Sequence, residues 1–311
     1  MKVLVAGDTG LAGTAISKKF KSAGAEVIGV NRKIVNLLDL TQTRNFLLQS
    51  KPDLVISSAA KVGGILANQN FPVEFLIENV SIQNNLLLAS HEASVPRLVF
   101  LGSSCIYPKF SQQPIKEEFF LTGALESTNS AFAVAKIAGI ELVNAFRRQH
   151  KRNWISLMPT SLYGPFDNFH ETDAHVIPSL IRKFHAAVAT GARQVTLWGT
   201  GTPRREFLHV DDFAAAVFVC ATSNYNDSMH INVGTGKDVS IQELSELIAR
   251  LSGFVGEILW DSTFPDGTPR KVLDIGKVTN LGWSPKVTLE QGISETIAWY
   301  TENLRSGSIR I

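Results

Sequence analysis

The amino-acid sequence predicts an α/β protein, with a doubly wound parallel sheet and a smaller α/β part toward the C-terminus. Two observations carry this prediction. Short apolar runs alternate with helical segments over residues 1–165, as when the run Lys2–Ala6 is followed by a helical pattern over 14–20. Between these two elements stands the spacing Gly7-x-x-Gly10-x-x-Gly13, which lets a strand turn sharply into a helix.

The glycine turn predicts a binding site for the pyrophosphate of a dinucleotide. A strand that turns into a helix leaves free backbone N–H groups at the positive end of the helix dipole, and this end attracts a phosphate. The alternative is a tight turn without a ligand. We expect the coenzyme to contact Gly7, Asp8, Thr9, Gly10, Leu11, Ala12 and Gly13.

The end of the second strand, 26–30, favours NADP over NAD. Dinucleotide folds usually carry Asp or Glu there to hold the ribose diol, whereas this chain has Asn31-Arg32-Lys33. A guanidinium pairs with a 2′-phosphate through two hydrogen bonds, and a carboxylate repels it. The alternative is a solvated pair of surface cations.

The remaining elements follow from apolar runs for strands and from apolar residues three or four apart for helices. We expect strands over 54–57, 97–101 and 154–159, with helices over 41–50, 71–93 and 129–150. After residue 165 the alternation stops, and we expect helices over 175–190, 240–251 and 289–303, a strand over 195–198, and a strand and helix over 208–221. Ser240 and Glu243 have the spacing of a capping box, and residues 260–270 are rich in turn formers.

This pattern predicts two domains. Residues 1–165 with 206–235 form an NADP-binding Rossmann domain, and residues 166–205 with 236–311 form a substrate-binding domain over the open edge of the sheet. Trp198 and the cations Lys183, Arg204, Arg205 and Arg270 suit a ligand with phosphates and a flat base, although scattered surface charges are the alternative.

Bulk composition excludes several classes of protein. The chain has 311 residues and a formal charge of +2, so no broad basic surface indicates nucleic acid or membrane as a partner. Its two cysteines, Cys105 and Cys220, are far apart in sequence and typical of a reducing cytoplasm. We expect no signal peptide, membrane span or metal site.

The carboxyl end of the fourth strand, 97–101, carries hydroxyl and thiol groups at the edge where ligands bind in open α/β sheets. The Ser103 hydroxyl can hydrogen-bond a substrate carbonyl there. The Cys105 thiol can exchange a proton if nearby cations lower its pKa, whereas the ordinary fate of a free cysteine is to be a small buried hydrophobe.

Six segments together resemble the extended short-chain dehydrogenase/reductase superfamily and, within it, the GDP-L-fucose synthase family. They are LGSSCIYPK (101–109), AKIAGIEL (135–142), LYGPFDNFH (162–170), HVIPSLIRKFH (175–185), WGTGTPRREFLHVDD (198–212) and PDGTPRKVLD (265–274). The resemblance runs over nearly the whole chain. It implies an NADP(H)-dependent enzyme that epimerises C3 and C5 of GDP-4-keto-6-deoxy-D-mannose and then reduces C4.

The same resemblance implies roles for single residues. Cys105 and His175 are the acid and base of epimerisation, and Ser103 and Lys136 assist hydride transfer. The implied substrate contacts are Lys183, Trp198, Arg205, Asp266 and Arg270. Beyond the glycine turn, the implied coenzyme contacts are Asn31, Arg32, Asn36, Leu37, Leu101, Gly102, Ser103, Ser104, Lys136, Pro159, Thr160, Ser161, Leu162 and His175. Paired helices 71–93 and 129–150 imply a homodimer.

Two positions depart from the family pattern. Phe132 stands where the family has the tyrosine that protonates the C4 oxygen, so we expect reduction to be impaired. Thr9 stands where an arginine often holds the 2′-phosphate, which leaves Arg32 as the main support for NADP. Two other functions therefore stay open: an epimerase or reductase of a related GDP-linked 4-keto sugar (heptose or dideoxy sugar), and a catalytically silent dinucleotide-binding protein.

Overall fold

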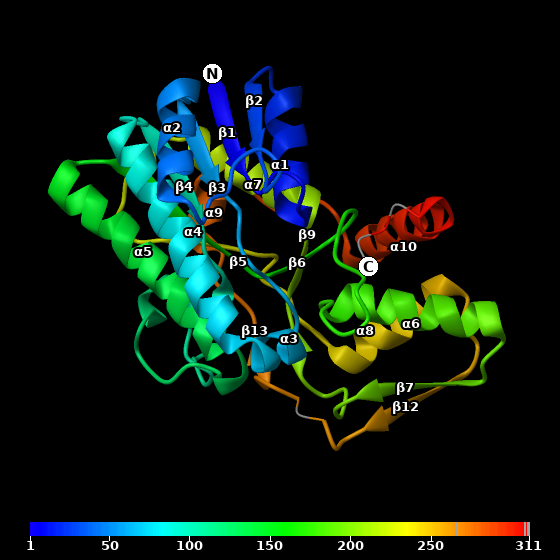
Figure 1. The fold of residues 1–311 in the computed structure, drawn as a ribbon. Helices are drawn as coiled ribbons and strands as arrows, with labels where there is room; N and C mark the ends of the chain where they lie inside the picture. The colour runs from blue at the N-terminus through cyan, green and yellow to red at the C-terminus, as the bar shows by residue number, and fades with distance from the viewer. Residues whose placement is uncertain (265, 308, 310–311) are drawn as a thin grey trace.

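The central element is a sheet of six parallel strands, as the sequence predicts, in the order β10-β5-β4-β3-β1-β2 (Figure 1). In this computed structural model, which describes residues 1–264, 266–307 and 309, Pro265 of the 265–274 segment lies outside the described residues. The strands are β1 (Lys2–Ala6), β2 (Glu26–Val30), β3 (Leu54–Ser57), β4 (Arg97–Leu101), β5 (Asn153–Pro159) and β10 (Ile231–Val233). The chain leaves β1 toward β2 and then turns back to β3, which makes the sheet doubly wound and creates a binding crevice at that reversal.

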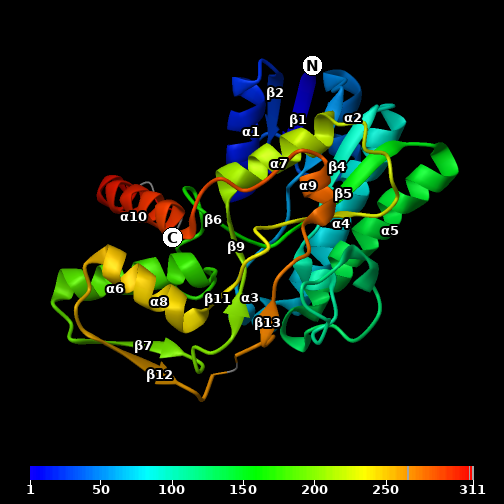
Figure 2. The ribbon, with the colours of Figure 1, turned by 180° about the vertical axis from the view of Figure 1, so that it is seen from behind.

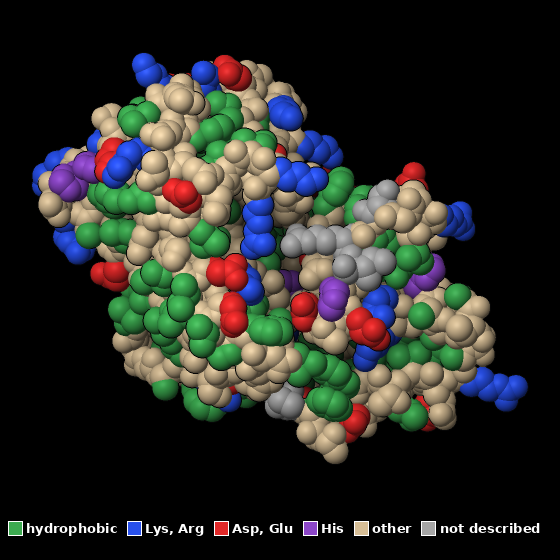
Figure 3. Space-filling model, viewed as in Figure 1, with side chains coloured by type: hydrophobic (Ala, Val, Ile, Leu, Met, Phe, Trp, Pro, Cys, Tyr) green, Lys and Arg blue, Asp and Glu red, His purple; other side chains and the backbone are tan. Residues whose placement is uncertain are grey.

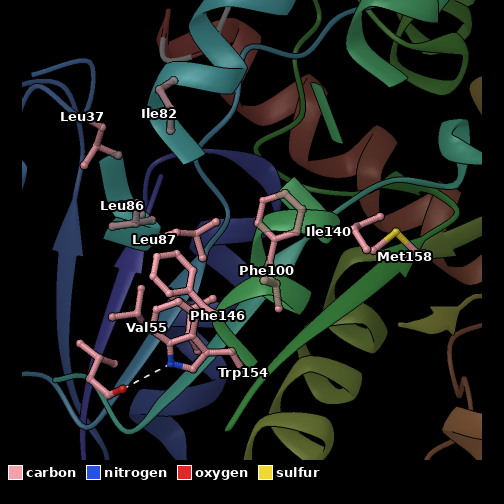
Figure 4. Close-up of a cluster of buried hydrophobic side chains, with 14 of the residues drawn as sticks. Leu37, Val55, Ile82, Leu86, Leu87, Phe100, Ile140, Phe146, Trp154 and Met158 are labelled. Atoms are coloured by element: carbon pink, nitrogen blue, oxygen red, sulfur yellow. Dashed lines mark hydrogen bonds between the residues drawn. The ribbon is translucent and has the colours of Figure 1, made fainter. Parts of the chain in front are cut away.

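Helices cover both faces of the sheet, and this explains why its strands are unbroken apolar runs (Figures 1 and 2). One face carries α2 (Leu40–Ser50), α4 (Pro72–Glu92) and α5 (Ser130–His150), and the other carries α1 (Leu11–Ser22), α7 (Val210–Thr222) and α9 (Gly276–Asn280). On the first face Phe100, Phe146 and Trp154 pack with leucines of α4 (Figure 4). The Trp154 indole donates a hydrogen bond of 3.3 Å to the Val95 carbonyl, so its one polar group is satisfied in the core.

A second part of the chain packs around its own core beyond the carboxyl edge of the sheet (Figure 1, lower right). It contains α6 (Val176–Thr190), α8 (Ile241–Ser252) and α10 (Leu289–Ser306), with the parallel pair β7 (Gln194–Trp198) and β12 (Glu257–Asp261). The capping box predicted from Ser240 and Glu243 is present at the start of α8. A small sheet of β11 (Val239–Ser240), β8 (Arg204–Arg205) and β13 (Arg270–Lys271), and the pair β6 (Ser161–Tyr163) and β9 (Phe207–His209), lie between the two parts.

Glu206 ties together the segments that cross between the two parts. Its buried carboxylate accepts hydrogen bonds from the backbone N–H groups of Thr235 (2.5 Å), Gly236 (2.6 Å) and Leu273 (2.9 Å). Its carbonyl accepts one from the Thr160 hydroxyl at 3.1 Å. Because a buried carboxylate is costly without such partners, these bonds hold the crossings in one arrangement.

Some short elements were not predicted. They include α3 (Ile65–Asn70), the 3₁₀ turns η1 (Ser104–Ile106), η2 (Glu117–Phe119) and η3 (Ser127–Asn129), and the strands β10 and β12, which are too short to show a periodic pattern. Val278 and Trp283 pack into the core between α1, α7 and the sheet, so this stretch of the proposed substrate domain lies on the coenzyme side. Within the described part of the chain, no helix has the length and apolar character needed to cross a bilayer.

Candidate active site

The glycine turn fits a pyrophosphate. Gly7 has φ +85°, and a Cβ on Gly13 would collide with the Gly7 carbonyl, so both positions need glycine. Helix α1 begins at Gly10 with no side-chain cap and no acidic residue in its first turn. By contrast, side chains cap α2, α8 and α10. The first N–H groups of α1 are therefore available to an anion, which is what a dinucleotide requires.

The predicted contacts around the adenosine end are of different kinds. Asn31 donates a hydrogen bond of 3.1 Å to the Asp8 carboxylate, which connects the end of β2 to the glycine turn. The Arg32 side chain is 84% exposed and contacts Glu78 on α4 at 3.4 Å. The Leu37 side chain is buried in the core, so any coenzyme contact there belongs to its backbone.

The thiol of Cys105 lies on the turn η1, directly after β4. The Ser103 hydroxyl accepts a hydrogen bond of 3.3 Å from the Cys105 N–H and caps this turn. Burial raises the pKa of the thiol, while the charges of Lys271 and Lys136 and a hydrogen bond with Ser103 oppose that rise. The thiol is therefore protonated at neutral pH, but the ammonium groups of Lys271 and Lys136 would stabilise its thiolate if it formed.

A buried polar network fixes the far end of the same turn. The Tyr107 hydroxyl donates a hydrogen bond of 2.5 Å to Asn232 on β10 and lies 2.7 Å from His230 Nε2. The Asn232 backbone N–H in turn donates a hydrogen bond of 3.0 Å to the Glu117 carboxylate. Burial lowers the pKa of His230 to about 4, so this imidazole is neutral at neutral pH. The network therefore holds the Tyr107 side chain in place through hydrogen bonds that involve no charged histidine.

Lys136 and Phe132 share one face of α5. The buried Lys136 ammonium donates a hydrogen bond of 2.9 Å to the Leu101 carbonyl and lies 5.7 Å from the centroid of the Phe132 ring. That ring packs edge-on against Phe75 at 6.2 Å. Burial lowers the pKa of Lys136 to about 8, because desolvation disfavours the charged ammonium. The lysine is thus a buried cation at the reactive edge.

Replacing Lys136 by methionine is expected to stabilise the protein at pH 7 by about 1–3 kcal/mol, since burying this charge costs folding energy. Between pH 8 and its ordinary pKa of 10.5 the lysine releases its proton in the folded chain but keeps it when unfolded, so wild-type stability rises with pH there. Denaturant unfolding at several pH values measures both effects. Lys18→Met, at an exposed position, is the control, and an equal stabilisation there would contradict the prediction.

His175 approaches from the second part of the chain. It precedes α6 without capping it, and its side chain is exposed, yet the surrounding protein excludes enough water to lower the pKa of the imidazole. A group that is both accessible and partly desolvated lies on the wall of a recess, and Figure 3 shows the surface hollowed between the two parts. The Gly64 N–H donates a hydrogen bond of 2.9 Å to the Asp173 carbonyl, and Gly63 lies against Phe75. The segment before His175 therefore lies near Phe75, whose ring packs against that of Phe132.

The predicted substrate residues fall into two groups. Arg205 is half-buried, donates hydrogen bonds to the carbonyls of Arg204 (2.9 Å) and Asp266 (3.2 Å), and has its pKa lowered by desolvation. Lys183 lies 5.4 Å from the ring centroid of Trp198, which is 47% exposed. The guanidinium and the ammonium group remain able to bind a phosphate, and the exposed face of Trp198 remains able to stack on a base.

Asp266 and Arg270 are engaged elsewhere. The Asp266 carboxylate accepts hydrogen bonds of 2.8 Å from both the N–H and the hydroxyl of Thr200, and so fixes the turn after Trp198. Arg270 pairs with Asp238, which also binds Arg204 at 2.8 Å. A substrate contact of Arg270 would require it to leave this carboxylate.

Sequence reasoning missed two site residues. Lys271 stands beside Arg205 in the parallel pair β8–β13 and acts electrostatically on the Cys105 thiol. Phe264 stacks on Trp198, with ring centroids 4.4 Å apart and planes 8° from parallel. Both lie in or near the turn-rich stretch 260–270, where no periodicity shows which side chains point inward.

The fold and these groups define a class of protein. Residues 3–234 match the NAD dependent epimerase/dehydratase family, and this span contains the six-stranded sheet except for Lys2, together with the glycine turn and the Cys105 turn. The chain belongs to this family. Its coenzyme is accordingly a nicotinamide dinucleotide.

More particular relatives share nearly the full length. The chain is 50% identical over 307 residues to GDP-L-fucose synthase 1 of Arabidopsis thaliana, covering 97% of this chain and 94% of that protein. It is 46% identical over 311 residues to GDP-L-fucose synthase of Escherichia coli K12, covering 97% of each. These relatives confirm the family predicted from the sequence motifs.

Two solved structures agree. The NADP-bound GDP-L-fucose synthetase of Naegleria fowleri has a TM-score of 0.90 at 28% identity, covering 100% of this chain and 96% of that one. A GDP-6-OMe-4-keto-L-xylo-heptose reductase of C. jejuni has a TM-score of 0.91 at 31% identity, covering 97% and 98%. The overall arrangement is thus shared with reductases of GDP-linked sugars.

Proposed function

We propose that this chain epimerises GDP-4-keto-6-deoxy-D-mannose at C3 and C5 and reduces C4 with NADPH, which gives GDP-L-fucose. The observation that carries the proposal is that Cys105 follows β4 at the carboxyl edge of the sheet, with the charge of Lys136 acting on its thiol. The full-length similarity to GDP-L-fucose synthases supports the substrate.

Epimerisation needs one group to remove a proton and another to return one on the opposite face. The C4 ketone acidifies the hydrogens on C3 and C5, because the enolate delocalises the charge. A protonated thiol at Cys105 and a neutral imidazole at His175 provide one proton donor and one acceptor at neutral pH. The ammonium of Lys271 favours any step in which the sulfur becomes negative.

Reduction uses a different set of residues. NADPH, when bound, supplies the hydride for C4. Ser103 can hydrogen-bond the C4 oxygen, and Lys136 can hold the nicotinamide ribose, as the family resemblance implies. Phe132 has no proton to give, so we propose that C4 reduction is slow in this chain while epimerisation is retained.

We propose that the glycine turn holds the pyrophosphate and that Arg32 favours the 2′-phosphate of NADP. We also propose that Arg205 and Lys183 bind the diphosphate of the sugar nucleotide, with the base at Trp198. Arg205 supports this placement because the two hydrogen bonds described above go to neutral carbonyls and not to a carboxylate, although the charges of Asp266 and Glu126 act on it from nearby.

Incubation with GDP-4-keto-6-deoxy-D-mannose in D₂O tests the proposal. We expect deuterium at C3 and C5 by NMR, and slow oxidation of NADPH followed by absorbance. Absence of exchange with this sugar, in protein that binds NADPH, would contradict the proposed substrate and favour a silent binding protein.

A second candidate is a related GDP-linked 4-keto sugar such as a heptose, favoured by the TM-score of 0.91 to the heptose reductase. A panel of keto sugars in the same exchange experiment separates the two. Faster deuterium exchange on the GDP-linked heptose than on GDP-4-keto-6-deoxy-D-mannose would show that the heptose is the substrate.

We propose that the chain acts in the cytoplasm as a homodimer. The outer faces of α4 and α5 expose Val73, Ile77 and Val134, which is the pattern of helices that pair with a second copy. Both cysteines are free, as expected in a reducing compartment. Light scattering at micromolar concentration is expected to give twice the chain mass, and Ile77→Glu is expected to give monomer.

A further inference from the structure

A three-membered charge cluster lies at the carboxyl end of β1 and is not explained by the catalytic roles above. Glu78, on α4, contacts the Arg32 guanidinium at 3.4 Å and the Lys61 ammonium at 2.7 Å. The side chains of Glu78 and Lys61 are 23% and 29% exposed, whereas Arg32 is 84% exposed. The cluster therefore has a fixed half, Glu78 with Lys61, and a movable half, Arg32.

Topology places this cluster across the coenzyme site. β1 lies between β2 and β3 in the sheet, Arg32 follows β2, and Lys61 follows β3. The bridge through Glu78 therefore spans the end of β1, where the glycine turn begins. The end of β3 is also close to that turn, since a Cβ on Gly7 would meet the Ala59 Cα at 2.8 Å.

Asn79 holds Lys61 in this position. Its side chain accepts a hydrogen bond of 2.9 Å from the Lys61 N–H and donates one of 3.0 Å to the Lys61 carbonyl. Asn79 itself is buried on α4, next to Glu78 in the sequence. The clamped backbone and the ion pair with Glu78 together hold the Lys61 ammonium beside this carboxylate.

We infer that Glu78 is a specificity-determining residue for the coenzyme, which competes with the 2′-phosphate of NADP for the cations Arg32 and Lys61. This inference rests on the proposed NADP dependence and adds Lys61 as a second phosphate-reading cation. A phosphate with nearly two negative charges displaces one carboxylate from Arg32, while the diol of NAD has no charge with which to do so. Glu78 thus weakens NADPH binding and leaves NADH binding nearly unchanged.

The variant Glu78→Gln tests the inference by binding rather than by turnover. We expect the Kd of NADPH, followed by its own fluorescence, to fall about 3- to 10-fold, and the Kd of NADH to change less than about 2-fold. The NADPH effect should shrink at high salt, since the charges are partly exposed. Lys61→Met is expected to weaken NADPH binding and to reduce the benefit of Glu78→Gln in the double variant.

The matched control is Glu92→Gln, on the same helix. Glu92 pairs with Arg44 through hydrogen bonds of 2.5 and 2.9 Å, far along α4 from the glycine turn, and its change should leave both Kd values unaltered. An unchanged or weaker NADPH affinity in Glu78→Gln, or an equal change for both coenzymes, would overturn the inference. If the unmodified chain binds NADH but not NADPH, the proposed coenzyme itself is wrong.

Discussion

Replacing Phe132 by tyrosine is expected to raise the rate of C4 reduction by about 10²–10⁴-fold, the usual contribution of a positioned general acid. The ring already lies 5.7 Å from the Lys136 ammonium on the same face of α5, so an added hydroxyl would point into an electropositive site. That environment lowers the pKa of a phenol and helps it exchange a proton. NADPH oxidation with the keto sugar, in single turnover, measures the effect.

Phe132→Leu is the matched control, because it replaces the same ring by another apolar side chain that has no hydroxyl. We expect reduction by this variant to stay at the level of the unmodified chain or below it. Deuterium exchange at C3 and C5 should be similar in all three proteins. A tyrosine variant no faster than the phenylalanine chain would show that the C4 oxygen receives its proton from another group.

Replacing Cys105 by serine is expected to lower deuterium exchange at C3 and C5 at least about 100-fold, since a hydroxyl is a far weaker acid than a thiol and is almost never ionised at neutral pH to act as a base. The substitution is small and keeps the hydrogen-bonded turn η1, so the fold should persist. NMR of the sugar after incubation in D₂O gives the rate directly.

Cys220→Ser supplies the control. Cys220 is fully buried in α7, on the opposite face of the sheet from α4 and α5, and burial raises its pKa to about 12. Exchange should be unaffected by its loss, although stability falls. Equal exchange in the Cys105→Ser chain and the unmodified chain would remove the thiol from the mechanism.

Much of the fold was predictable because its strands are apolar on both faces and its helices are long. β1 to β5 and helices α4 and α5 match the expected ranges within a residue or two. The turn η1 was not predicted, since three residues cannot show a period. The sequence indicated that Ser103 and Cys105 stand at the reactive edge, because that edge follows from the parallel topology alone.

The electrostatics of the site could not be predicted in the same way. The pKa of Lys136 depends on how deeply α5 buries it, and Lys271 reaches the thiol only because β13 pairs with β8. Asp238 forms ion pairs with both Arg204 and Arg270, so these two cations are already occupied by a carboxylate. Such pairings arise between segments distant in the chain, and a single sequence does not record them.

The anchoring of Tyr107 by Asn232 has a consequence for synthesis. β10 joins the sheet beside β5 only after residues 160–230, which lie between the two strands in the sequence, have been synthesised, so the turn that carries Cys105 receives its last support late. A ribosome-bound fragment that ends before Ile231 already contains the glycine turn but lacks Asn232, which accepts the hydrogen bond of the Tyr107 hydroxyl. On the ribosome, coenzyme affinity should therefore mature before chemical competence does, because domains assemble as their strands emerge.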